Sequence, residues 1–139
     1  MPPPDRTLTR LIKLIAVLNV FHLVDHILRG DFHWPIDEQS VGFIVVATII
    51  LGGIALGLWL YRSGRVGSLI WTIFGALGLG LGWLSHFSPM TDQPVSVIYH
   101  AYHSAAGGVL AVACLLGLML AVLTATVYAW YLWIGRVRA

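Results

Sequence analysis

Charged residues are scarce in this sequence: they make up 10% of its 139 residues, against about 25% in an average soluble domain. Hydrophobic residues reach 58%, which is typical of a chain that lies largely within a lipid bilayer. The basic residues are too dispersed to form a nucleic-acid surface, and the formal net charge is only +2. The composition therefore predicts an integral membrane protein that has the lipid bilayer, and no nucleic acid, among its partners.

Cysteine is nearly absent as well. A single residue, Cys114, leaves no internal disulfide and no CxxC zinc or redox motif. We interpret it as a packing residue, because it lies deep in an apolar segment. The sequence also lacks the GxSxG and HExxH patterns of common hydrolases, so hydrolytic chemistry has little support.

Four apolar segments are long enough to cross a hydrocarbon core, which takes about 20 helical residues. They cover approximately residues 8–29, 41–61, 66–86 and 98–134. Because the connections between them are short, successive spans are expected to be antiparallel neighbours. The predicted fold class is all-α: an integral membrane antiparallel four-helix bundle, with residues 1–139 forming a single four-span transmembrane domain.

Basic residues are distributed unequally between the two sides of this domain. Only Arg29 falls on one side, and the remaining lysine and arginine residues fall on the other: Arg6, Arg10, Lys13, Arg62, Arg65, Arg136 and Arg138. The positive-inside bias places the basic side in the cytoplasm. We therefore expect both termini to be cytoplasmic, in a bacterial plasma membrane, with the connections 30–40 and 87–93 on the outer side.

The first span carries polar side chains on one face. At about 100° per residue, these side chains fall within an arc of roughly 120°: Asn19, His22, Asp25, His26 and Arg29. An ionisable group facing lipid costs at least about 2.5 kcal/mol on insertion scales. We therefore expect this polar stripe to face other helices, water or a ligand.

All six histidines of the sequence map to the outer half of the predicted domain. A second polar stripe begins the fourth segment, with the HxxH pair of His100 and His103, and His86 ends the third segment. Imidazole and carboxylate ligands suit zinc, copper or iron. The candidate metal ligands are His22, Asp25, His26, His86, His100 and His103.

Haem b is the second cofactor that this pattern permits. Two imidazoles from facing helices can hold haem iron inside a bundle, which is similar to the general plan of membrane b-type cytochromes. The candidate axial ligands are His22 or His26 on the first span and His100 or His103 on the fourth. Glycines in the third span, at positions 75, 78 and 82, would make room for a flat ligand or for close helix packing.

The length of the fourth segment decides whether these histidines can meet. From His103 to Trp130 is about 40 Å of helix, which exceeds the hydrocarbon thickness. The helix therefore tilts, breaks near Gly107 and Gly108, or protrudes on the outer side. Only some of these arrangements place His103 level with His26.

Several polar residues also have purely structural explanations. Asp25 and Arg29 are one helical turn apart and can neutralise each other. His33 reads as a solvated loop residue. His86, His100 and His103, each beside an aromatic residue, can equally lie at the membrane interface.

Three functions remain consistent with the sequence. We expect a multi-pass membrane protein that binds a transition metal or haem near the outer face and transfers electrons, with a quinone as one candidate partner. One alternative is a non-catalytic accessory or assembly subunit of a larger membrane complex or homo-oligomer, docked through its glycine faces. Another is a proton-linked transporter component, although titratable residues are missing from the cytoplasmic half of the spans.

Overall fold

The computed structural model describes residues 4–91 and 93–138, and the ends of the predicted domain and Asp92 lie outside the described residues. The described chain is helical, with no strand among these residues. Its helices are α1 (Arg6–Arg29), α2 (Glu38–Arg62), α3 (Leu69–His86), α4 (Val95–His100) and α5 (Ala105–Val137). The helices α1, α2, α3 and α5 are long and apolar enough to cross a membrane, in agreement with the predicted integral membrane class.

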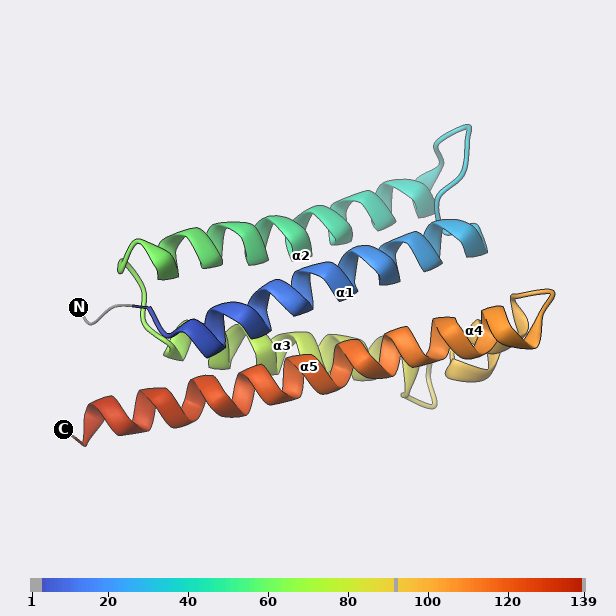
Figure 1. Ribbon diagram of the computed structural model, residues 1–139. Helices are drawn as coiled ribbons and strands as arrows, with labels where there is room; N and C mark the ends of the chain where they lie inside the picture. The colour runs from blue at the N-terminus through green and yellow to red at the C-terminus, as the bar shows by residue number, and fades with distance from the viewer. Residues whose placement is uncertain (1–3, 92, 139) are drawn as a thin grey trace.

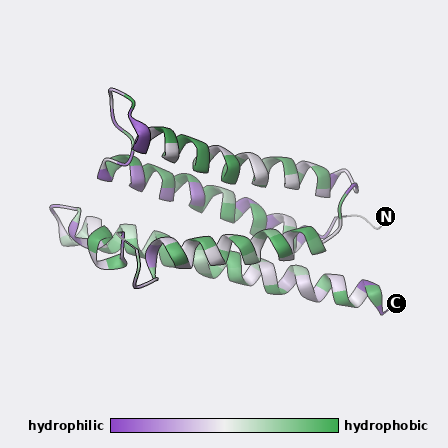
Figure 2. Ribbon diagram, turned by 180° about the vertical axis from the view of Figure 1, so that it is seen from behind, coloured by the Kyte–Doolittle hydropathy of each residue, from purple (hydrophilic) through white to green (hydrophobic). Residues whose placement is uncertain are grey.

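The four long helices lie side by side (Figure 1). Helix α5 packs against α1 and α3, and α2 packs against α1. Both ends of the described chain lie at the same end of the molecule, which we call the terminal end; the α1–α2 loop lies at the opposite end, which we call the histidine end. Apolar residues run along α2 between hydrophilic residues at its two ends (Figure 2), as expected for a helix in contact with lipid.

Local capping fixes where the helices begin. The Asp5 carboxylate accepts a hydrogen bond from the Leu8 amide at 2.8 Å, and Asp37 accepts one from the Ser40 amide at 2.9 Å. Ser104 caps α5 in the same way, through the Gly107 amide at 3.1 Å. Each cap satisfies an amide that the first helical turn leaves without a partner.

The expected fourth span, 98–134, is interrupted. Helix α4 ends at His100, the chain turns through residues 101–104, and α5 then runs from Ala105 to Val137. Gly108 permits this fold-back, because a Cβ at that position would clash with the Tyr99 carbonyl oxygen. The break lies just before the Gly107–Gly108 pair, and it removes His100 and His103 from the continuous helical face that the sequence suggested.

Two apolar clusters hold the helices together. The cluster at the terminal end joins α1, α2, α3 and α5 through Leu8, Ile12, Ile54, Tyr61, Trp71, Ala125 and Ala129. A smaller cluster packs α4 on α5 through Ile98, Ala111 and Leu115. Between these helices lies a partly open cavity that extends from the first cluster to the histidine end.

Candidate metal centre

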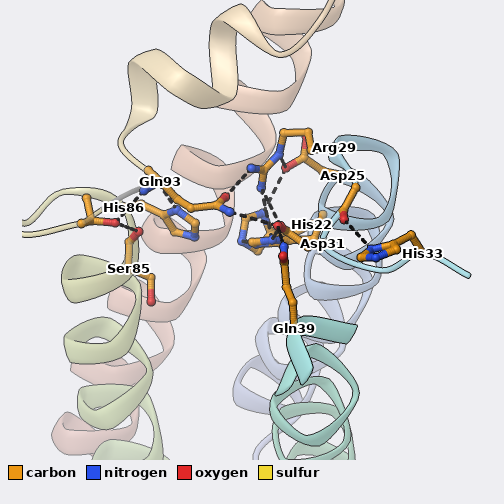
Figure 3. A network of polar contacts seen from close by, with 12 residues as sticks. His22, Asp25, Arg29, Asp31, His33, Gln39, Ser85, His86 and Gln93 are labelled. Atoms are coloured by element: carbon orange, nitrogen blue, oxygen red, sulfur yellow. Dashed lines mark hydrogen bonds and ion pairs between the residues drawn. The ribbon is translucent and has the colours of Figure 1, made fainter. Parts of the chain in front are cut away.

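Three histidines converge at the histidine end. His22 and His26 lie one turn apart on α1, so they share a face, and His86 is the last residue of α3. One potential ligand atom from each lies within 4.8 Å of the others. The ring centroids are 4.6 Å apart for His22 and His26, 5.2 Å for His22 and His86, and 5.7 Å for His26 and His86. Figure 3 shows the surrounding polar network.

A carboxylate orients His26. Gly30 adopts a left-handed conformation, with φ of 97°, and ends α1, which brings the Asp31 amide to the His26 carbonyl oxygen at 3.0 Å. The same turn places the Asp31 carboxylate 2.6 Å from His26 Nδ1. An ionised carboxylate only accepts hydrogen bonds, so His26 Nδ1 carries a proton, and in the neutral ring Nε2 then keeps its lone pair.

Arg29 Nη2 also lies 3.2 Å from His26 Nδ1. Because a guanidinium only donates, it cannot form a hydrogen bond with a protonated Nδ1. The short, charge-assisted contact with Asp31 determines the tautomer.

A backbone carbonyl orients His86 in the same manner. His86 Nδ1 lies 3.2 Å from the carbonyl oxygen of Gln93, and the residue is only 5% exposed. A carbonyl oxygen cannot donate, so Nδ1 again carries the proton and Nε2 is free to act as a ligand. Histidines that bind metals commonly donate their second ring nitrogen to a carboxylate or a backbone carbonyl, as His26 and His86 do.

His22 completes the group. Its Nε2 lies 3.1 Å from His26 Nε2, whereas its buried Nδ1 has no hydrogen-bond partner among the described residues. Two imidazole nitrogens on one tetrahedral ion, with metal–nitrogen distances of about 2.0–2.1 Å, would lie about 3.3 Å apart. The separation of the two Nε2 atoms is therefore close to what a shared ion requires.

Gln93 connects the segments around this group. Its side-chain amide donates to Asp31 Oδ1 at 3.0 Å, and its side-chain oxygen accepts from Arg29. Gln39, in the first turn of α2, also donates to Asp31 Oδ1, at 3.1 Å. Burial alone would raise the pKa of Asp31, but the hydrogen bonds from His26 and Gln93 outweigh it and hold that pKa below its usual value of 3.8.

Asp25 is held by Arg29 and Tyr102, and its Oδ2 also lies 4.0 Å from His22 Nδ1. The predicted Asp25–Arg29 pair is present, with Arg29 Nε at 3.0 Å from Asp25 Oδ2. The Tyr102 hydroxyl donates to Asp25 Oδ1 at 2.6 Å, which ties the α4–α5 connection to α1. Burial, reinforced by this bond, raises the pKa of Tyr102 to about 12. Asp25 thus supports Arg29 and does not join the group of potential ligand atoms.

The remaining histidines lie apart from this group. His100 and His103 are exposed, at the end of α4 and in the connection to α5. His33 is exposed in the α1–α2 loop, where its Nε2 lies 3.3 Å from Asp37 Oδ2. The structure therefore brings together His22, His26 and His86 of the six expected ligands and leaves Asp25, His100 and His103 outside.

A cavity of about 1020 Å³ lies beside the three histidines, between α1, α2, α3 and α5. His22, His26 and His86 line its histidine end, and Ile12, Ala125 and Thr126 line it toward the terminal end. At that end, Gly53 and Gly57 of α2 lie against Phe74 and Trp71 of α3, where an added Cβ would meet the aromatic rings.

Sequence reasoning missed the residues that orient the imidazoles. Asp31 was open to detection, because a glycine directly after a helix folds the next residue back over the last turn. Gln39, Gln93 and Tyr102 carried no such local signal, since the chain fold alone brings them to α1. No protein-family model matches the chain, and comparisons with curated proteins and with solved structures find no match.

Proposed function

We propose that this protein is an integral membrane metal-binding protein that holds one transition metal ion through His22, His26 and His86. The observation that carries the proposal is the convergence of three imidazoles, two of which have a fixed acceptor at Nδ1. With Nδ1 of His26 and His86 at 2.6 and 3.2 Å from these acceptors, the neutral rings offer Nε2 as a ligand in a shared space. The 3.1 Å separation of His22 Nε2 and His26 Nε2, which is close to what a shared ion requires, also supports a ligand at this site.

A compact ion fits this space better than haem. Bis-imidazole haem needs two rings on opposite faces of a flat macrocycle. Here three rings lie with centroids 4.6 to 5.7 Å apart, and two of them come from the same helix. Three imidazoles and one open position are a known arrangement for catalytic metal ions. Copper or iron in this site would support the electron-transfer role expected from the sequence, and zinc would not.

The orientation in the membrane is part of the same proposal. An antiparallel four-helix bundle with cytoplasmic termini in a bacterial plasma membrane places the metal centre near the extracytoplasmic face. The basic residues gathered toward the terminal end support this orientation.

Elemental analysis of the purified protein in detergent tests the metal site. We expect one zinc, copper or iron ion per chain, and loss of that ion in His26→Asn and His86→Asn. An asparagine amide can replace Nδ1–H as the donor but offers nothing in place of Nε2, so these variants remove the ligand and keep the orienting hydrogen bond. Circular dichroism checks that the variants remain helical.

His103→Asn is the matched control, because His103 is exposed and lies outside the group. We expect this variant to keep its ion. A wild-type protein that stays metal-free after incubation with all three metals would contradict the proposal, as would equal metal loss in His103→Asn.

A further inference from the structure

The lining of the cavity is mostly apolar, and its ionisable side chains lie at the histidine end. Among the described residues that line it, the ionisable side chains are His22, His26, His86 and Asp31, and no lysine or arginine is present. Along α1 the lining runs from His26 to Ile12, which is about 21 Å of helix. The cavity is therefore long, with one polar end and one apolar end. We refer to it as the chamber.

The size of the chamber suits a whole lipophilic molecule. Small-molecule sites usually occupy about 300–1,000 Å³ and bury most of the ligand, and this chamber reaches about 1020 Å³. Leu77, Leu81, Val46 and Ile50 on its walls offer contact for a hydrocarbon chain.

The charged side chains near the polar end determine which lipid headgroups fit there. Arg29 is the nearest cation, but its Nε donates to Asp25, its Nη1 donates to Gln93 and its Nη2 lies 3.9 Å from Asp31. Apart from the proposed metal ion, a phosphate group would meet no free cation at this end and would approach the Asp31 carboxylate. The side chains themselves therefore favour a neutral headgroup over an anionic one.

A neutral headgroup with a hydroxyl is a good match. In the metal-free site, an imidazole with its proton on Nδ1 presents Nε2 as an acceptor, and a hydroxyl can donate to it. With an ion bound, the Nε2 atoms are occupied, and an alcohol, alkoxide or phenolate oxygen can take the open position on the ion.

We propose that the chamber binds a neutral lipophile with a hydroxyl-bearing head, which lies against the three histidines while its hydrocarbon chain extends toward Ile12 and Thr126. For the headgroup, this inference rests on the proposed metal function, because the bound ion would contact the hydroxyl. For the hydrocarbon chain, it rests on the chamber alone. Membrane phenols of the quinol type and long-chain alcohols share this chemistry.

Binding of 4-decylphenol to the metal-loaded protein in nanodiscs of neutral lipid tests the proposal, with 1-hexadecanol as a second arm. We expect saturable binding of at least one probe, and the stronger arm shows whether an aromatic or an aliphatic hydroxyl is preferred. The methyl ether of the preferred probe can neither donate a hydrogen bond nor lose a proton to become an anionic ligand of the ion, so its binding should be at least about tenfold weaker.

A substitution on α2 tests where the hydrocarbon chain of the ligand lies. Ala47 lines the chamber, one turn along α2 from Phe43, whose ring lies 6.0 Å from that of His26. Ala47→Phe should fill the space beneath the histidines and weaken probe binding at least about tenfold. Ala55→Phe is the matched control, because Ala55 is exposed on the same helix and does not line the chamber.

Metal content measured on every variant separates the two proposals. Normal metal content in Ala47→Phe with lost probe binding supports the chamber. Metal present in all of these proteins without saturable probe binding overturns the chamber and leaves the metal site. No metal in any protein, with probe binding that Ala47→Phe still removes, overturns the metal site and supports the chamber. Equal binding by Ala47→Phe and wild type, equal binding of the methyl ether, or displacement of the probe by phosphatidylglycerol would overturn the inference.

Discussion

At the scale of single residues, Asp31 links the metal site to the rest of the protein. Its Oδ2 accepts from His26, and its Oδ1 accepts from Gln39 and Gln93, so one carboxylate joins α1, α2 and the segment after α3. Its side chain is 12% exposed, and its charge is balanced by Arg29 nearby. Such an orienting partner raises the basicity of a metal-binding imidazole and holds the ring in place.

Asp31→Asn should lower metal affinity by about 10- to 100-fold, because the imidazole loses its anionic partner. The pKa of Asp31 is lowered in the folded protein, so its ionised form adds stability that is fully present above its ordinary value of 3.8. That stability is lost as the pH falls through the lower folded-state pKa. Chelator competition measures the affinity, and thermal unfolding between pH 3 and pH 7, in steps of about one unit, measures the stability.

Asp37→Asn is the control for this experiment. Asp37 also has a lowered pKa, caused mainly by hydrogen bonds from Ser40, but it caps α2 and lies outside the metal group. It should alter the pH dependence of unfolding and leave metal affinity unchanged. Wild-type metal affinity in Asp31→Asn would show that this carboxylate does not support the site.

At the scale of elements, the ends of the helices build the site. Gly30 ends α1 and turns the chain so that Asp31 lies against His26. His86 is the last residue of α3, and its Nδ1 contacts the carbonyl oxygen of Gln93 in the following loop. Helix α4 packs onto α5 at Gly108, and the connection that follows it places the Tyr102 hydroxyl within hydrogen-bond distance of Asp25. The long helices set the depth of the histidines, and the turns that follow them set the orientation of the rings.

Gly30→Ala and Gly64→Ala form a matched pair that tests this role of the α1 terminus. Both glycines have positive φ, 97° and 72°, and an added Cβ at either position meets nothing within 4 Å. Each variant should lose about 1 kcal/mol of stability through backbone strain. Only Gly30→Ala should also weaken metal binding, because only that turn positions Asp31. Equal metal affinity in the two variants, measured by chelator competition, would contradict this account.

At the scale of the whole molecule, the apolar core is divided between the two ends. One cluster joins the four long helices near the terminal end, and another fastens α4 to α5. The chamber runs from the three histidines toward the terminal end, where Ile12 and Ala125 of the first cluster also line it, and polar contacts such as Arg29 to Gln93 join the segments near the histidines. This division allows a packed scaffold and a ligand-sized space to coexist in a small chain.

The orientation of the whole molecule can be read with reporter fusions. We expect alkaline phosphatase to be active when fused after Trp34, in the α1–α2 loop, and inactive when fused after Gly64 or at the C-terminus. The physical reason is the concentration of arginine and lysine on the side that contains Gly64 and both chain ends. A green fluorescent protein fusion should give the opposite pattern. An active C-terminal phosphatase would invert the proposed topology.

The sequence by itself determined the membrane class, the four long apolar helices and the placement of His22 and His26 on one face. These follow from composition and from the helical period, which are local properties. The inward position of the polar stripe was also predictable: the His22 and His26 side chains are 12% and 18% exposed, in keeping with the high cost of ionisable groups in lipid.

Only the tertiary structure decided which other residues meet that pair. The sequence did not distinguish His86, His100 and His103 as partners of that pair. The packing of α3 places His86 beside it, whereas the chain turn at 101–104 leaves His100 and His103 exposed. Gln93 and Tyr102 reach α1 from 64 and 77 residues away. Contacts at that separation depend on how helices are joined and packed, which no local pattern of residues encodes.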